Sequence, residues 1–117
     1  MARGRAPELV VNGDGGVVRD YVHVADMADA FARALGACRT GHWTAYNVGS
    51  GRRSTIMDVV AAVEAAAGRV LPVRHDPPAA EPAELLADAS RIRRDLGWRP
   101  EASDLQRIVA DAYTAAG

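Results

Sequence analysis

The chain contains no lysine, because all 14 of its basic residues are arginines. A chain without lysine has no Walker-type phosphate lysine, no lysine for a Schiff base and no Tyr-x-x-x-Lys catalytic pair. These three chemistries are therefore closed to this chain acting alone.

Cysteine and long apolar runs are nearly absent as well. The single Cys38 cannot form an internal disulfide or a cysteine-based metal cluster, which favours a reducing, cytoplasmic setting. No apolar stretch approaches the ~20 residues of a transmembrane helix, and the first residues lack a signal-peptide core. The formal net charge is −1 and the arginines are scattered, so neither a nucleic-acid surface nor a membrane surface is predicted. His42 and His75 have no ligand spacing, so no metal site is expected.

The 117 residues allow one domain, and their pattern predicts an α/β mixture of short strands and about four helices. Helices are predicted at 26–36, 55–68, 90–96 and from 103 to about 113. Their expected N-terminal caps are Asp26, Thr55, Ser90 and Ser103. Short strands are predicted at 9–11, 19–24, 45–48 and 70–74. The first helix is expected to bury Met27, Ala30, Phe31, Ala34 and Leu35 along one stripe, and Trp98 is expected to pack over the end of the third.

Residues 18–30 form the central stretch, a strand that runs into a helix behind the glycine-rich turn 13–16. Arg19 stands at the start of that strand, where its forked guanidinium is well placed to bind a phosphate. The simpler alternative is that Arg19 only pairs with a neighbouring carboxylate such as Asp14 or Asp20. His23 shares the expected strand face with Tyr21 and is better explained as a hydrogen-bonded structural residue than as a catalytic base.

A strand, the sequence Gly49-Ser50-Gly51 and a helix together resemble the start of a dinucleotide-binding loop. The third glycine of such a loop is absent because Ser54 stands in its place. No acidic residue closes a following strand at the usual distance of about 20 residues. A tight strand-to-helix turn is therefore the better interpretation, and no cofactor-binding residue is predicted here.

Three stretches then stand in one order along the chain. They are Gly13-Asp14-Gly15 leading to Arg19-Asp20-Tyr21-Val22-His23-Val24-x-Asp26, then Tyr46-Asn47-Val48-Gly49-Ser50-Gly51, then Ala87-Asp88-Ala89-Ser90 leading to Leu96-Gly97-Trp98. In this order they resemble the C-terminal part of the NAD-dependent nucleotide-sugar epimerase/dehydratase family. The members of this family are extended short-chain dehydrogenases/reductases. Within the family, the motif with histidine is most similar to the UDP-glucose 4-epimerase group. The resemblance covers about residues 4–113, and only about the last third of a family member.

The resemblance implies that residues 1–117 are a single domain, the nucleotide-sugar-binding part of an epimerase-like fold without its N-terminal Rossmann half. In the family, that half binds NAD through a glycine-rich loop and carries the catalytic Ser or Thr and the Tyr-x-x-x-Lys pair. The chain alone is therefore expected to bind no NAD and to contain no catalytic residue. The function that remains is the binding of a UDP-sugar.

The resemblance also implies the substrate-binding residues. Arg19 matches the arginine that binds the pyrophosphate, Glu81 falls where an aspartate hydrogen-bonds the ribose, and Tyr21 is a third candidate. A second phosphate-binding arginine falls at Pro78 and is therefore missing, with Arg74 as a conceivable substitute. Binding is expected to be weak.

Two functions stay open at this point. The chain is either a UDP-sugar-binding portion that is inert until a Rossmann-containing chain joins it, or a non-enzymatic remnant that associates with itself or another protein. Both predict an apolar surface left uncovered by the missing half, and hence a homo-oligomer or a complex with a Rossmann-containing chain. Met1-Ala2-Arg3-Gly4 reads like the last turn of a helix, so Met1 is expected to be an internal residue of a longer ancestral enzyme or a start assigned too late.

Overall fold

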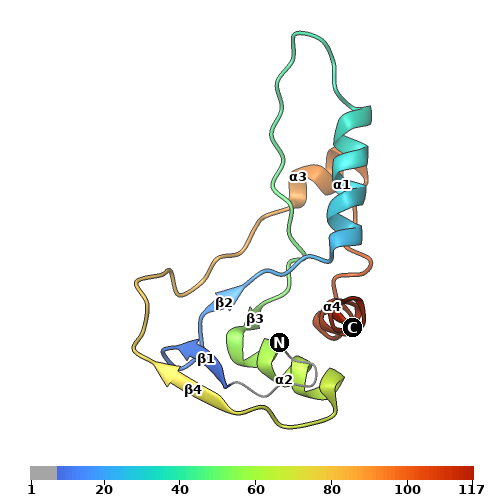
Figure 1. Cartoon of the computed structure of the whole chain (residues 1–117). Coiled ribbons are helices and arrows are strands. Elements are labelled where there is room, and N and C mark those ends of the chain that lie inside the picture. The colour runs from blue at the N-terminus through green and yellow to red at the C-terminus, as the bar shows by residue number, and fades with distance from the viewer. Residues whose placement is uncertain (1–7) are drawn as a thin grey trace.

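The computed structural model describes residues 8–117, so the expected helix end at residues 1–4 lies outside the described residues. Within this range the fold is α/β, with four helices and short strands, as the sequence predicts (Figure 1). The positions of the strands differ from the predicted ones, and β3 is a strand that the sequence analysis does not predict. In chain order the elements are β1 (Leu9–Asn12), β2 (Val18–Arg19), α1 (Val24–Gly36), β3 (Ser54–Thr55), α2 (Ile56–Ala67), β4 (Val73–Asp76), α3 (Ser90–Leu96) and α4 (Leu105–Ala116). No helix among these residues is long and apolar enough to cross a membrane.

The elements gather at two ends of an elongated molecule of 52 × 32 × 20 Å. Figure 1 shows α1 and α3 together at one end, and the strands with α2 and α4 at the other. Helices α2 and α4 pack against each other in this second group. A long loop beyond α1 extends from the first end and returns toward β3.

The strands form two separate two-stranded pairs. Strand β1 runs parallel to β4, with Leu9 opposite Val73, and β2 runs antiparallel to β3, with Arg19 opposite Ser54. The strand predicted at 19–24 is therefore wrong beyond Arg19. The strand predicted at 70–74 begins three residues late, after Pro72, whose carbonyl accepts a hydrogen bond from the Leu9 N–H.

The strand predicted at 45–48 is also wrong, since no ladder forms there. The side chains do alternate as in a strand: Tyr46 and Val48 are partly buried against the core, and Asn47 between them is exposed. However, the backbone of residues 43–49 has no hydrogen-bond partner among the described residues. A strand is defined by its neighbour, and none lies beside this segment.

Helix α2 has the ends that the sequence predicts. The Thr55 hydroxyl accepts from the Asp58 N–H, and the Asp58 carboxylate accepts from the Thr55 N–H, which is a complete capping box. The helix ends at Gly68, whose φ of 71° lies in the left-handed region that favours glycine.

The other three expected caps are wrong. Helix α1 is capped by the His23 ring and α4 by the Asp104 side chain, while Ser90 is the first helical residue of α3, behind Ala89. Asp26 and Ser103 do not cap a helix because they are hydrogen-bonded to each other across the molecule.

The tightest core joins α1 and α3 and consists of Ala30, Ala89, Ile92 and Trp98. Trp98 is fully buried, and its indole Nε1 donates to the Asp26 carbonyl at 2.9 Å, which confirms its role in packing. The stripe expected on α1 is only half right. Ala30 is buried, but Phe31 and Leu35 are exposed.

Candidate functional site

Arg19 lies at the end of β2 and is held by three oxygen acceptors. Its Nη1 donates to the carbonyls of Val18 at 2.8 Å and Pro82 at 3.0 Å, and its Nη2 donates to the Glu81 carboxylate at 2.7 Å. The two carbonyls fix the guanidinium in place, and the carboxylate neutralises it. The structure thus brings together two predicted site residues, Arg19 and Glu81, which are 62 positions apart in the chain.

Arg19 does pair with a carboxylate, as the simpler alternative expects, but the partner is Glu81 and not Asp14 or Asp20. Asp14 accepts from the Gly16 N–H within its own turn. The Asp20 Oδ1 accepts from the N–H of Ser50 at 2.7 Å and from its hydroxyl at 2.6 Å.

The loop Gly49-Ser50-Gly51 therefore wraps around a carboxylate. Besides the Ser50 donors, the N–H of Gly51 points at Asp20 Oδ2 at 3.4 Å. A Cβ on Gly49 would lie only 2.5 Å from the same oxygen, so glycine is needed for this close approach. The role of Asp20 is not among the sequence predictions, because Asp20 and Ser50 are 30 positions apart and no local pattern joins them.

An open pocket of about 390 Å³ lies beside the Arg19–Glu81 contact. Glu81 connects the two, because it accepts a hydrogen bond from Arg19 and also lines the pocket. The other lining residues come from the β1–β2 turn and from the loop after β4: Asn12, Gly13, Asp14, Val17, Pro78, Ala79 and Ala83. Pro78 packs against Gly13, so an apolar ring occupies the place where a second arginine is expected.

Arg74 does not line this pocket. Its Nε donates to Asp76 at 3.0 Å and its Nη1 to Glu8 at 2.5 Å, and these carboxylates raise the pKa of the guanidinium. Tyr21 is partly buried, and its hydroxyl has no hydrogen-bond partner within residues 8–117. The structure does not bring either residue into the Arg19–Glu81 contact.

A second arginine–glutamate pair lies nearby on different residues. Arg53 precedes β3 and donates to Glu84, which lies beside Val18 of β2. This hydrogen bond is the main reason that the pKa of Glu84 is lowered and that of Arg53 is raised. Arg53 lines a different pocket, between α2 and α4, and so does not replace the missing arginine at Pro78.

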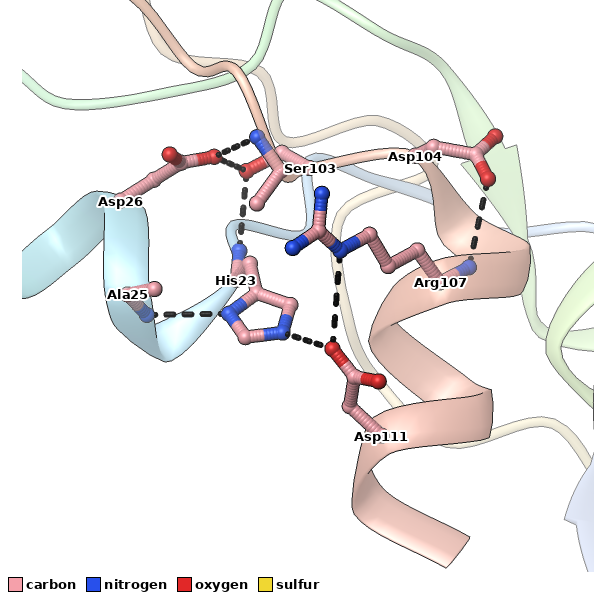
Figure 2. Close-up of polar contacts among 8 residues, drawn as sticks. His23, Ala25, Asp26, Ser103, Asp104, Arg107 and Asp111 are labelled. Carbon is pink, nitrogen blue, oxygen red and sulfur yellow. Dashed lines mark hydrogen bonds and ion pairs between the residues drawn. The ribbon is translucent and has the colours of Figure 1, made fainter. Parts of the chain in front are cut away.

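His23 joins the beginning of α1 to α4, as Figure 2 shows. Its Nδ1 accepts from the Ala25 N–H at 2.9 Å, and its Nε2 lies 2.7 Å from the Asp111 carboxylate. Because Nδ1 is an acceptor, the ring proton of the neutral imidazole is on Nε2 and is donated to Asp111. Both ring nitrogens have structural partners, which supports the interpretation of His23 as a structural residue.

Asp26 and Ser103 complete this polar cluster (Figure 2). Asp26 Oδ2 accepts from the Ala102 N–H at 2.8 Å and from the Ser103 hydroxyl at 2.6 Å. The Ser103 oxygen in turn accepts from the His23 N–H at 2.9 Å. No group of three or more His, Cys, Asp or Glu residues within the described chain is arranged to hold a metal ion.

Comparisons with known proteins agree with this picture. Residues 1–49 match the sequence model of the NAD dependent epimerase/dehydratase family. The UDP-glucose 4-epimerase of Corynebacterium glutamicum is 38% identical over 101 residues, which are 86% of this chain and 31% of that protein. The chain thus spans about a third of the length of the curated relatives it matches.

Solved structures show the same fold. The crystal structure of UDP-glucose 4-epimerase from Bifidobacterium longum, in complex with NAD+ and UDP, matches with a TM-score of 0.84 and 32% identity. That match covers 93% of this chain and 34% of the other. The enzyme from Stenotrophomonas maltophila, with bound NAD and formylated UDP-arabinopyranose, matches with a TM-score of 0.81 and 32% identity, over 99% of this chain and 38% of the other.

Proposed function

This chain corresponds to the C-terminal part of the NAD-dependent epimerase/dehydratase family, and on that premise we propose that it is the UDP-sugar-binding portion of a UDP-glucose 4-epimerase-like protein. We further propose that residues 1–117 act as one domain and are catalytically incomplete without a second, NAD-binding part. The observation that carries the proposal is the contact between Arg19 and Glu81 at the edge of an open pocket.

Arg19 has the chemistry to bind a diphosphate. The Val18 and Pro82 carbonyls orient its guanidinium, while its Nη2 is directed at a carboxylate that occupies the position of an anion. This ion pair is partly exposed and contributes at most about 1 kcal/mol, so an incoming phosphate can displace Glu81. Glu81 would then be free to accept a hydrogen bond from a ribose hydroxyl at the same site.

The affinity is expected to be low. A charge-assisted hydrogen bond to a phosphate contributes roughly 1.5–3 kcal/mol, and Pro78 supplies no such bond where a second arginine is expected. The loss corresponds to about tenfold to a hundredfold weaker binding. Tyr21 remains a proposed third contact, reached only if the ligand extends beyond the pocket.

NAD does not fit the described residues. A dinucleotide loop offers free N–H groups to the pyrophosphate. In this chain the N–H groups of Ser50 and Gly51, the loop that most resembles such a site, are directed at the Asp20 carboxylate. A carboxylate held there would also repel a phosphate, so we propose that this chain alone binds no NAD.

We also propose a cytoplasmic location, because a single cysteine, Cys38, is typical of proteins in a reducing compartment.

The alternative function is a non-enzymatic module that associates with copies of itself. The observation that favours it is the exposure of Phe31 and Leu35 on α1. This alternative needs no nucleotide, so ligand binding distinguishes it from the first proposal.

The test is thermal unfolding of the chain with UDP, UDP-glucose or NAD at millimolar concentration. A ligand at 100 times its dissociation constant adds about 2.7 kcal/mol, which shifts the midpoint by several degrees for a domain of this size. We expect a shift with both UDP compounds and none with NAD. Arg19→Ala should abolish it, whereas Arg94→Ala, at an exposed arginine of α3, should leave it unchanged.

The absence of any shift with UDP would contradict the proposed function. A shift that survives Arg19→Ala would contradict the proposed site, because the ligand would then be bound elsewhere.

A further inference from the structure

Glu81 is held beside Arg19 by the backbone that follows it. The Val18 N–H of β2 donates to the Ala83 carbonyl at 2.8 Å, and the Arg19 Nη1 donates to the Pro82 carbonyl at 3.0 Å. The Glu81 backbone is therefore anchored at the end of β2. Its carboxylate can leave Arg19 by a change of side-chain rotamer that breaks neither of these backbone contacts.

The charges at the pocket favour the paired state of Arg19 when no ligand is bound. Two carboxylates line the pocket, Asp14 and Glu81, and Arg19 supplies a positive charge at its edge. The Asp14 carboxylate accepts from the Gly16 N–H at 2.8 Å, which holds it in place. Two negative charges thus stand against one positive charge. An inorganic phosphate enters against this excess and must also break the ion pair before it meets Arg19.

A ligand that displaces Glu81 leaves a carboxylate without its partner. The side chains of Arg19 and Glu81 are only 19% and 32% exposed, so water does not fully hydrate a charge that loses its partner there. A hydroxyl group of the ligand can donate to the freed carboxylate and offset this cost, since hydrogen bonds to a charged acceptor are the stronger ones. A nucleoside diphosphate carries both the anion and the ribose hydroxyls, whereas inorganic pyrophosphate carries only the anion.

The same contact also opposes a ligand that has hydroxyl groups alone. A nucleoside brings no anion for Arg19, so the Glu81 carboxylate stays on the Arg19 Nη2 at 2.7 Å. A carboxylate neutralised in this way is a weaker acceptor for a ribose hydroxyl. Each half of the ligand is therefore bound well only when the other half is present.

We propose that Glu81 is the specificity-determining residue of this site, because it closes Arg19 against anions and releases it to a ligand that carries a diphosphate and a ribose hydroxyl together. Binding of the two groups is then coupled. The site selects a nucleoside diphosphate over both inorganic pyrophosphate and a nucleoside. This role of Glu81 rests on the proposed function and adds to it the residue that makes the selection.

The first test is an NMR titration of the full chain with UDP, inorganic pyrophosphate or uridine, for the unmodified chain and for Glu81→Gln. Glutamine keeps the length of the side chain and removes its charge. We expect pyrophosphate to bind Glu81→Gln about threefold to fivefold tighter, the upper value corresponding to the ~1 kcal/mol of a partly exposed ion pair. UDP should bind no tighter, because its ribose loses a charged acceptor. The preference for UDP over pyrophosphate then falls by at least the same factor.

Glu84→Gln is the matched control. Glu84 lies three positions further along the chain and also pairs with an arginine, Arg53, but it does not line this pocket. Its substitution should leave the affinities for all three ligands unchanged. The amide spectra recorded in the same titrations show whether each variant keeps the fold.

The second test uses Arg19→Ala, for which the two ligands should respond in opposite directions. UDP should bind more weakly, because its diphosphate loses the guanidinium. Uridine should bind more tightly than to the unmodified chain, because the Glu81 carboxylate is no longer occupied by Arg19. An arginine that only contacts the phosphate would weaken UDP binding without improving the binding of uridine.

Two results would overturn the role of Glu81 and leave the proposed function intact. In both, the unmodified chain binds UDP. In one, Glu81→Gln binds pyrophosphate no tighter than the unmodified chain does, and in the other, the affinity of Arg19→Ala for uridine does not rise. An unmodified chain that binds no UDP in the titration would overturn the proposed function and the selection by Glu81 together.

Discussion

At the scale of single residues, Asp26 is expected from the sequence to cap α1, but in the structure it connects α1 to a distant segment of the chain. Its carboxylate is buried and accepts from the Ala102 N–H and the Ser103 hydroxyl, while its backbone carbonyl accepts from the Trp98 indole. One residue thus ties α1 to the segment between α3 and α4. A buried carboxylate is tolerated in a fold only when its hydrogen bonds are made, and here they are.

We predict that Asp26→Ala lowers the free energy of unfolding by about 1–3 kcal/mol, because the buried donors of Ala102 and Ser103 lose their acceptor. Asp29→Ala is the control in the same helix. It removes an exposed pair with Arg33 that contributes only about 0.3–0.5 kcal/mol. Urea denaturation followed by circular dichroism measures both, and equal effects would show that the Asp26 network does not stabilise the fold.

At the scale of elements, the beginning of α3 shows how a helix is started without a side-chain cap at its first flanking position. Ala89 holds that position and has no side chain for the purpose. Asp88 instead accepts from the N–H and the hydroxyl of Ser90, and these two bonds lower the pKa of the Asp88 carboxyl. A carboxylate near the first turn also lies at the positive end of the helix dipole.

The sign of the resulting pH dependence follows from this lowered pKa. The Asp88 bonds contribute stability at pH values above the unfolded-state pKa of about 3.9, and they are lost as the pH falls through the lower pKa of the folded chain. We predict that Ser90→Ala raises the Asp88 pKa toward its ordinary value, as measured by NMR titration of the carboxyl. The pKa of Glu84, lowered by Arg53, is the internal control and should not change. An unchanged Asp88 pKa would mean that Ser90 is not its main partner.

At the scale of the whole molecule, the described chain is extended rather than compact. Its Cα radius of gyration is 16.9 Å, whereas a compact domain of this length has about 13 Å. The helices α1 and α3 lie apart from the strands, α2 and α4, and the polar cluster of Asp26, His23, Ser103 and Asp111 spans between the two groups (Figures 1 and 2).

We predict that small-angle scattering of the Phe31→Asp chain gives a radius of gyration near 16.9 Å and not near 13 Å. The Phe31→Asp variant is chosen because self-association through the exposed Phe31 and Leu35, the alternative function, would otherwise dominate the scattering. A value close to the compact one would show that the two groups of elements collapse onto each other in solution.

The sequence by itself determined the features that depend on near neighbours. The capping box of α2 joins Thr55 and Asp58, three residues apart, and Gly68 ends the helix through its own backbone freedom. The existence of the four helices belongs to the same class. Such features are set by bonds and contacts over a few residues, which the chain makes wherever it folds.

Only the tertiary structure decided which distant groups meet. It paired Arg19 with the carboxylate of Glu81 instead of Asp14 or Asp20, and it bonded Asp26 to Ser103, which left the capping of α1 and α4 to other residues. Each of these contacts joins groups more than 60 residues apart. Their hydrogen bonds are available only after the segments have been brought together, so no local pattern encodes them.

Two predictions failed for a similar reason: the strand at 45–48 does not form, and the apolar stripe on α1 is only partly buried. Alternating side chains and apolar helical spacing say which faces can be covered, but a strand also needs a neighbouring backbone and an apolar stripe needs a second layer. Within residues 8–117 neither is present, so the segment stays unpaired and Phe31 and Leu35 stay exposed. The sequence determined that these surfaces would be apolar, and the tertiary structure decided that they would be left open.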